Sequence, residues 1–118
     1  MLKIALSLLN KNALKNSRGR NITLVFGCGG DRDRTKRFKM GRIASKYSNK
    51  VIFTSDNPRD EDPKLIIDDM ILGVDDEDKK KVINIVDRKK AIEMASKIVK
   101  PNDILLIAGI QHLRYCLE

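Results

Sequence analysis

Short apolar runs alternate with segments of helical spacing along this 118-residue chain. The clearest run, Ile22 to Phe26, is continuous and bounded by turn residues, which is typical of a strand covered on both faces. Further runs of strand length are Val51 to Thr54, Val82 to Val86 and Ile104 to Ala108. Because strands and helices alternate, we predict an α/β fold, a Rossmann-like, mostly parallel sheet with helices on both faces.

Four helices are predicted before and between these strands. They cover Leu2 to Leu14, residues 36 to 48, a segment that begins at Asp62-Pro63, and the stretch from Ala91 to Val99. Asp favours the N-cap and Pro the first helical position, and Gly73 is the predicted stop of the third helix. The predicted inner faces consist of Met40, Ile43, Ala44 and Tyr47 in the second helix and of Leu65, Ile66, Met70 and Ile71 in the third. The charged residues 75–81 predict an exposed loop or a short helical turn.

The composition limits the class of protein. At 118 residues the chain forms one domain, which we place at residues 1–118. Its 42% hydrophobic and 4% aromatic residues favour an aliphatic core and give no platform for stacking nucleic-acid bases. Cys28, Cys116 and His112 are too few for a disulfide framework or a metal site. No apolar stretch approaches the roughly 20 residues of a membrane helix, so we expect a cytoplasmic protein with no membrane partner.

The net charge of +8 is unevenly distributed. Residues 1–50 hold 13 Lys and Arg against 2 Asp, a charge of +11, whereas residues 51–118 hold 11 against 14 Asp and Glu, a charge of −3. A basic half of this kind is one way to bind nucleic acid, because phosphate neutralisation supplies most of the non-specific affinity. A solvated basic face is the simpler interpretation. A non-enzymatic remnant that binds nucleic acid or another acidic partner is therefore the alternative function.

Two motifs follow neighbouring strand candidates. Gly27-Cys28-Gly29-Gly30-Asp31-Arg32-Asp33-Arg34 follows the first run, and Asp56-Asn57-Pro58-Arg59 follows the second. Open α/β sheets bind their ligands at the carboxyl ends of the strands. The first motif is not a dinucleotide loop, because the third glycine of G-x-G-x-x-G falls on Arg32, and it is not a Walker sequence either. Simple turns with solvated charges remain the alternative for both motifs.

The arginines give these motifs a chemical meaning. Arg32 and Arg59 are both placed to bind one carboxylate of a ligand in bidentate fashion. Asp56 and Asn57 are placed to hold an ammonium group beside it, so the pattern indicates an amino-acid ligand. His112 follows the last strand at the same edge, but the sequence identifies no acid–base partner for it. Cys28 is either a thiol activated by positive charge or a small apolar residue packed under the loop.

Several of these residues together resemble the C-terminal domain of the Mur ligases, over roughly residues 1–112. The matching motifs are Val25 to Asp33, Lys36-Arg37, Asp56-Asn57-Pro58-Arg59-x-Glu61-x-Pro63 and Ala108-Gly109. The resemblance is greatest to the MurE type, the ATP-dependent ligases that add meso-diaminopimelate to UDP-MurNAc-L-Ala-D-Glu in peptidoglycan biosynthesis. It implies that meso-diaminopimelate binds to Arg32, Asp56, Asn57, Pro58, Arg59 and Gly109. Lysine lacks the distal carboxylate, and a site built around that group rejects it.

The chain also departs from the family pattern. Where the family reads Gly-Lys-Gly-His-Glu after the last strand, this chain reads Gly109-Ile110-Gln111-His112-Leu113, which is atypical and lacks the glutamate for the substrate ammonium. Thr35 and Phe38 replace a usual Gly and Pro in the basic loop. The start corresponds to a helix that follows a strand in the family, which implies a domain incomplete at its N-terminus.

The resemblance also implies which parts of the reaction lie elsewhere. In the family a central domain holds ATP and Mg²⁺, so we expect neither to be bound by this chain alone. We also expect no ligase activity from the chain alone. The expected partners are meso-diaminopimelate and, if supplied in trans, the missing N-terminal and central domains.

Overall fold

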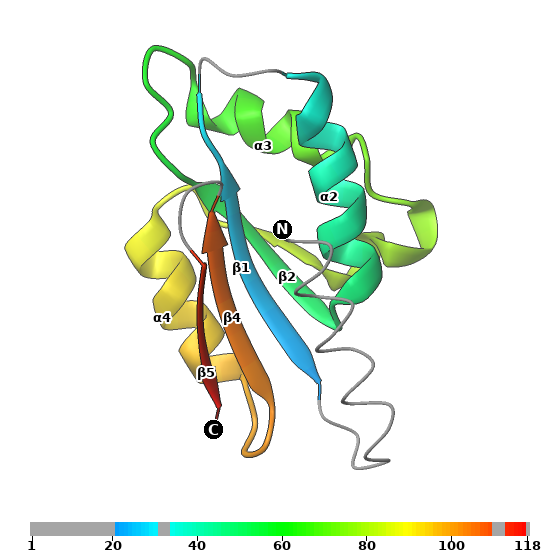
Figure 1. The fold of residues 1–118 in the computed structure, drawn as a ribbon, viewed down its shortest axis with the longest axis vertical. Coiled ribbons are helices and arrows are strands. Elements are labelled where there is room, and N and C mark those ends of the chain that lie inside the picture. Colours follow the sequence, from blue (N-terminus) through cyan, green and yellow to red (C-terminus); the bar gives the residue numbers. More distant parts are fainter. Residues whose placement is uncertain (1–20, 31–33, 110–112, 118) are drawn as a thin grey trace.

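The computed structural model describes residues 21–30, 34–109 and 113–117, and the predicted helix Leu2–Leu14, Arg32 and His112 lie outside them. A five-stranded sheet forms the centre of this part (Figure 1). Its strands, in the spatial order β3-β2-β1-β4-β5, are β1 (Ile22–Cys28), β2 (Lys50–Ser55), β3 (Val82–Asn84), β4 (Ile104–Gly109) and β5 (Leu113–Leu117). β1 to β4 are parallel, as predicted, and β5 runs antiparallel beside β4.

β5 is a strand that the sequence pattern does not predict. It begins at Leu113, which pairs with Ala108 of β4. Neither an Asn-Gly nor an Asp-Gly pair stands between β4 and β5. Without such a turn signal the local pattern does not indicate a hairpin.

β3 is shorter than predicted, because it ends at Asn84 rather than at Val86. The chain nevertheless stays beside β2, since the Ser55 N–H donates a hydrogen bond of 3.2 Å to the Val86 carbonyl oxygen. Helix α4 (Arg88–Ile98) therefore begins close to the carboxyl end of β2.

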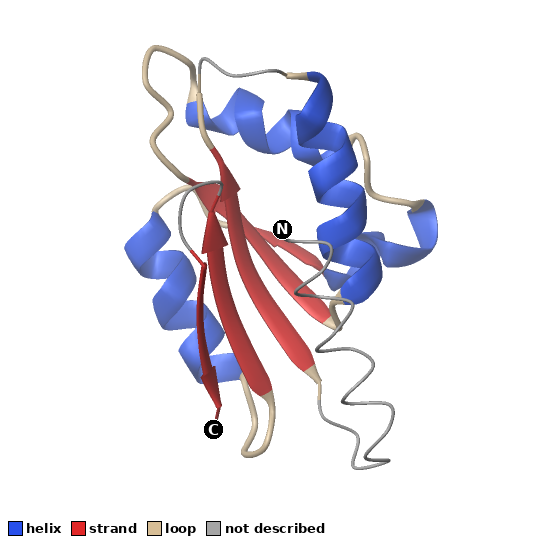
Figure 2. Cartoon of the chain, in the orientation of Figure 1, coloured by secondary structure: helices blue, strands red, loops and turns tan. Residues whose placement is uncertain are grey.

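Helices cover both faces of the sheet, as predicted (Figure 2). α2 (Thr35–Tyr47) and α3 (Pro63–Ile71) pack on one face and α4 on the other. α3 begins as its sequence predicts, with the Asp62 carboxylate accepting a hydrogen bond from the Lys64 N–H and Pro63 in the first helical position. The charged segment forms a short 3-10 helix, η1 (Asp76–Lys81). None of the described helices is long and apolar enough to cross a membrane.

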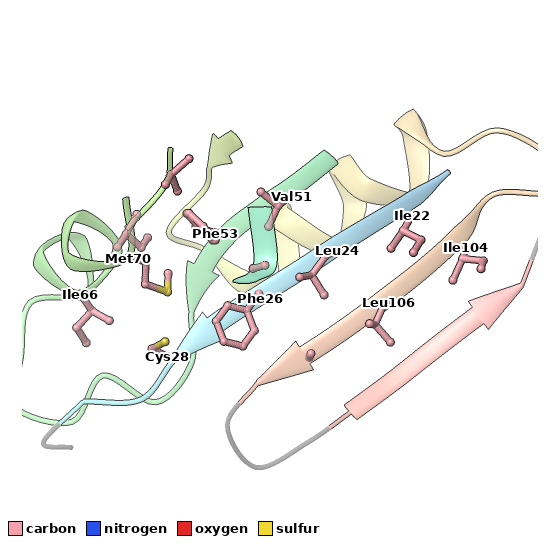
Figure 3. Close-up of a cluster of buried hydrophobic side chains, with 14 residues drawn as sticks. Ile22, Leu24, Phe26, Cys28, Val51, Phe53, Ile66, Met70, Ile104 and Leu106 are labelled. Carbon is pink, nitrogen blue, oxygen red and sulfur yellow. The ribbon is translucent and has the colours of Figure 1, made fainter. Parts of the chain in front are cut away.

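The larger core cluster lies between the sheet and the α2–α3 layer (Figure 3). Alternate residues of the strands point into it, as the two-residue period of a strand requires. The predicted inner face of α2 is confirmed, because Ala44 is buried and Met40, Ile43 and Tyr47 pack against the cluster. The sheet residues in the cluster are Ile22, Leu24, Phe26, Cys28, Val51, Phe53, Ile104, Leu106 and Ala108.

The buried face of α3 differs from the prediction. Leu65 is 58% exposed, whereas Ile67 is buried beside Ile66 and Met70. The cause is the close approach of α2, since a Cβ added at Gly41 would lie 2.0 Å from the Met70 carbonyl oxygen. The neighbouring helix therefore selects which apolar residues of α3 face inward.

Gly73 directly follows the C-cap of α3, as predicted for the stop of this helix, and it also allows close packing. α3 ends at Ile71, two residues earlier, with Leu72 as its C-cap. A Cβ added at Gly73 would lie 1.7 Å from the Phe38 carbonyl oxygen of α2. The backbone beyond α3 thus contacts the backbone of α2 at a position where only glycine fits.

Candidate functional site

The two sequence motifs meet at one edge of the sheet. β1 and β2 are parallel neighbours, with Gly27 opposite Thr54 at their carboxyl ends. β4 brings Gly109 opposite Gly27 on the other side of β1. The glycine-rich turn and the Asp56–Arg59 segment therefore leave the sheet side by side, as predicted (Figure 1). This edge is where parallel α/β sheets bind ligands.

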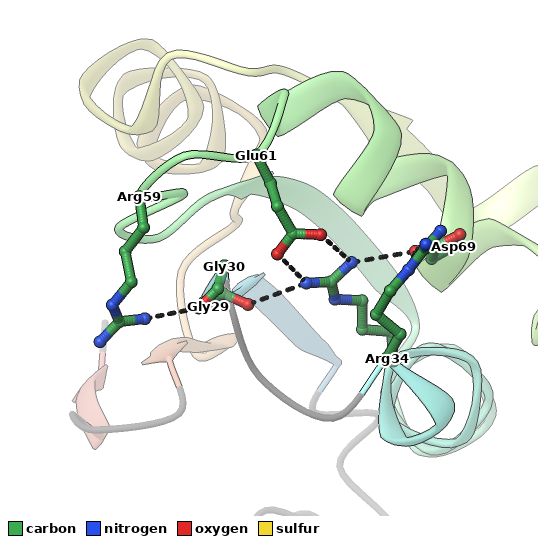
Figure 4. Close-up of polar contacts among 7 residues, drawn as sticks. Gly29, Gly30, Arg34, Arg59, Glu61 and Asp69 are labelled. Atoms are coloured by element: carbon green, nitrogen blue, oxygen red, sulfur yellow. Dashed lines mark hydrogen bonds and ion pairs between the residues drawn. The ribbon is translucent and has the colours of Figure 1, made fainter.

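The two segments are joined by one hydrogen bond between backbone groups and one from a side chain. The Gly30 N–H donates to the Asn57 carbonyl oxygen at 3.0 Å, and Arg59 Nη1 donates to the Gly30 carbonyl oxygen at 2.7 Å (Figure 4). A Cβ added at Gly30 would lie 1.7 Å from the Pro58 carbonyl oxygen. Glycine at position 30 is therefore required by space, and the two segments form one platform before any ligand arrives.

The Asp56–Arg59 segment holds an unusual backbone. Asn57 and Arg59 have φ values of 51° and 54°, in the left-handed region that residues other than glycine rarely adopt. Asn tolerates this conformation, but Arg has no such preference. Backbone conformations of this kind persist where the surroundings enforce them and cluster at functional sites. The strain therefore singles out this segment as a candidate binding element.

The Arg59 guanidinium has donors left for a ligand. Its residue is exposed, and within the described part of the chain only Nη1 has a protein partner, the Gly30 carbonyl oxygen. A guanidinium carries five N–H donors in a planar fork that matches a carboxylate. Asp56 and Asn57 stand three and two positions before it, so the segment carries both cationic and oxygen-bearing side chains.

A second arginine lies on the buried side of its helix. Arg37 lies on α2, where charged residues predict a solvated surface, yet its side chain is only 3% exposed. Its guanidinium donates to both carboxylate oxygens of Glu61, at 3.1 and 2.5 Å, and to Asp69 Oδ2 at 3.0 Å. It also donates to the Gly29 carbonyl oxygen at 3.4 Å. Chiefly the hydrogen bond to Glu61 raises the pKa of Arg37, so this side chain stays charged.

Figure 4 shows how these groups surround the glycine-rich turn. Arg59 reaches Gly30 from one side, while Glu61 and Asp69 lie on the other. Arg34 joins the second group through Asp69, at 3.3 Å. The turn that leads toward Arg32 is therefore held from two directions by charged groups.

Thr35 and Phe38, which the resemblance places in a basic loop, instead form the first turn of α2. Together with three further residues they line an open groove of about 410 Å³. The other lining residues are Arg34, Asp69 and Leu72. The two departures from the family pattern therefore lie on the surface of α2.

Cys28 packs under the turn, and burial raises the pKa of its thiol to about 12 against the lowering effect of nearby Arg37. Because the thiolate is the reactive form, we expect iodoacetamide at pH 8 to alkylate Cys28 at least about 100-fold more slowly in the folded chain than in urea. Peptide-resolved mass spectrometry measures this rate separately from that of Cys116. Equal rates in the two states would mean that the thiol is accessible and activated.

The acidic residues near η1 do not belong to this site. Asp75, Glu77 and Asp78 place oxygen atoms within 4.8 Å of one another. Asp78 is already paired with Lys81 at 2.9 Å, and η1 leads into the amino end of β3, at the opposite edge of the sheet. Asp75 is also paired, with Arg42 at 3.8 Å, so two of these three carboxylates have cationic partners within the described part of the chain.

Comparison with known proteins agrees with the fold and with the motifs. The family profile described as "Mur ligase, glutamate ligase domain" matches residues 8–110. The UDP-N-acetylmuramoyl-L-alanyl-D-glutamate--2,6-diaminopimelate ligase of Chlorobium phaeobacteroides is 51% identical over 94% of this chain. Ligases of the same name from Syntrophomonas wolfei and Aquifex aeolicus are 47% and 49% identical over 91% and 89% of the chain.

The chain spans only 20 to 22% of the length of these three relatives. The match is therefore to one part of a longer enzyme. That part has a parallel sheet whose carboxyl edge carries the two motifs, and its profile covers residues 8–110. On this evidence the chain belongs to the Mur ligase family and corresponds to its glutamate ligase domain.

Proposed function

We propose that this chain is the amino-acid-recognition domain of a ligase that adds meso-diaminopimelate to UDP-MurNAc-L-Ala-D-Glu in peptidoglycan biosynthesis. The observation that carries the proposal is the joined platform of Gly30, Asn57 and Arg59 at the carboxyl edge of the sheet. The names of the relatives supply the substrate, since each is a 2,6-diaminopimelate ligase. We propose that this domain comprises residues 1–118.

The site residues have distinct roles in this proposal. The Arg59 guanidinium pairs with the distal carboxylate of diaminopimelate, and Arg32 is its second cationic partner. Asp56 and Asn57 accept hydrogen bonds from the ammonium group beside that carboxylate. Pro58 and Gly109 form the backbone walls of the site. Lysine has no distal carboxylate, so its binding would leave the arginines without an anion.

The activating chemistry belongs to another part of the ligase. The family reaction uses ATP and Mg²⁺ to convert a substrate carboxyl group into an acyl phosphate. The described residues do not fit that group, because the glycine-rich turn lacks the Walker spacing and two carboxylates of the acidic cluster, Asp78 and Asp75, already pair with Lys81 and Arg42. We therefore assign to this chain the binding and orientation of the amino acid and no step of the ATP chemistry.

Titration calorimetry with meso-diaminopimelate and with lysine tests this function. We expect the 118-residue chain to bind diaminopimelate in preference to lysine. Arg59→Met should weaken diaminopimelate binding by about 10- to 100-fold, since a hydrogen bond to a charged group is worth about 1.5–3 kcal/mol. Arg42→Met is the matched control, because Arg42 is an exposed arginine of α2 that pairs with Asp75. Equal affinity for the two amino acids would contradict the proposal.

Nucleic-acid binding is the second candidate, and the surface of α2 favours it. α2 contains no acidic residue, and its Lys36, Lys39, Arg42 and Lys46 are exposed. Affinity for generic duplex DNA that falls steeply with rising salt, together with no affinity for diaminopimelate, would support this candidate. Arg34 and Arg42 already have carboxylate partners, which favours the amino-acid site.

A further inference from the structure

Arg37 connects three segments that are distant in the sequence. Its side chain comes from α2 and contacts the glycine-rich turn at Gly29, the segment after Arg59 at Glu61, and α3 at Asp69. One buried guanidinium therefore contacts both the glycine-rich turn, at Gly29, and the segment after Arg59, at Glu61. Arg59 supplies the other connection, from its own segment to Gly30.

We propose that Arg37 and Glu61 are positioning residues for the amino-acid site, an inference that rests on the proposed function. They hold the glycine-rich turn against the Asp56–Arg59 segment without contacting the ligand themselves. Gly29 and Gly30 stand three and two residues before Arg32, so holding these glycines determines where the segment leading to Arg32 begins. The pair thereby sets the position of Gly29 and Gly30 relative to the segment that carries Arg59.

The geometry requires an arginine at position 37. The guanidinium uses both terminal nitrogens on the two oxygens of Glu61 and also reaches Asp69 and the Gly29 carbonyl oxygen. A lysine ammonium is a single point of charge on a flexible stem, so it does not reproduce this planar set of contacts. Arg37→Lys keeps the positive charge but loses the planar set of donors. The variant therefore distinguishes a positioning role from simple charge pairing.

The cluster is balanced in charge, and Arg37 at its centre is buried whereas Arg34 is 68% exposed. Arg34 and Arg37 face Glu61 and Asp69, whose side chains are 26% and 21% exposed. Replacing Glu61 with glutamine leaves the buried Arg37 with one carboxylate fewer. Glu61 acts on the site through Arg37, which it holds in place. We therefore expect the glycine-rich turn to be displaced in Glu61→Gln while the rest of the domain stays folded.

Two variants and one matched control test the proposal in the 118-residue chain. Arg37→Lys and Glu61→Gln should each weaken diaminopimelate binding by about 10-fold or more, because small displacements of binding groups are costly. Asp78→Asn is the control, since Asp78 forms a similar partly buried ion pair with Lys81 at the opposite edge of the sheet. It should lower the unfolding free energy measured in urea and leave the affinity for diaminopimelate unchanged.

Amide NMR of the ligand-free chain gives a readout that a purely stabilising role would not move. The Gly29, Gly30 and Asn57 peaks should shift in Arg37→Lys and in Glu61→Gln but not in Asp78→Asn. If the pair acts as a unit, the double variant should bind diaminopimelate no more weakly than the weaker single variant.

The outcomes separate this inference from the proposed function. Wild-type affinity and unmoved peaks in both site variants would overturn the positioning role while the amino-acid site stands. An equal loss of affinity in Asp78→Asn would also overturn it, because general destabilisation would then explain the effect. No binding of diaminopimelate by the wild-type chain would overturn the proposed function and, with it, the positioning role.

Discussion

Replacing Gly30 with alanine is expected to lower the affinity of the chain for diaminopimelate by about 100-fold. The new Cβ would lie 1.7 Å from the Pro58 carbonyl oxygen and 2.4 Å from its carbonyl carbon. Both are backbone atoms of the Asp56–Arg59 segment, so no side-chain rotation relieves the clash. The two segments must move apart, which breaks the hydrogen bonds that Gly30 makes with Asn57 and Arg59.

Titration calorimetry measures this loss, and denaturation in urea shows whether the domain remains folded. Asn102→Gly is the control, because Asn102 also lies in a turn, has a φ of 75°, and precedes β4 at the amino edge of the sheet. Glycine there relaxes the backbone far from the site and should leave the affinity unchanged. Wild-type affinity in Gly30→Ala would show that the contact between the two segments has no part in binding.

The sequence predicts the frame of the site well, for a physical reason. Continuous apolar runs such as Ile22 to Phe26 specify buried strands, and parallel neighbours place their following loops at one edge. The adjacency of the glycine-rich turn and the Asp56–Arg59 segment follows from this rule alone. The role of Arg32 follows from its place after the first strand and from the family resemblance, that of Gly109 follows from the resemblance alone, and both stay predictions.

The burial of Arg37 is not predictable from the pattern of its own helix. A charged residue on a helix is usually solvated. Here the partners that make burial tolerable, Glu61 and Asp69, lie 24 and 32 residues further along the chain. Only the packing of α2 against α3 brings them within reach. The same packing buries Ile67 in place of Leu65, which the spacing of apolar residues does not distinguish.

β5 shows a different limit of the sequence. Five residues from Leu113 to Leu117 are too short and too mixed to stand out as a strand, and they acquire their conformation by pairing with β4. The conformation of an edge strand such as β5 therefore depends more on the strand it pairs with than on its own sequence.

Phe53→Ala is expected to destabilise the domain by about 3–5 kcal/mol. Phe53 is 0% exposed and lies opposite Phe26 in the parallel register of β1 and β2. Figure 3 places both rings in the cluster that the α3 residues Ile66 and Met70 cover. Domains of this size are stable by only about 5–15 kcal/mol, so the cavity removes a large share of the total.

Urea denaturation compares this loss with that of Phe38→Ala, a matched deletion of the same side chain. Phe38 is 44% exposed on α2 and lines the open groove, so its removal leaves a surface that water fills rather than a buried cavity. We expect a loss below about 1 kcal/mol for this control, as for most substitutions outside the core. Similar losses for the two variants would mean that the α2 surface is covered in solution, because only burial makes a phenyl ring costly to delete.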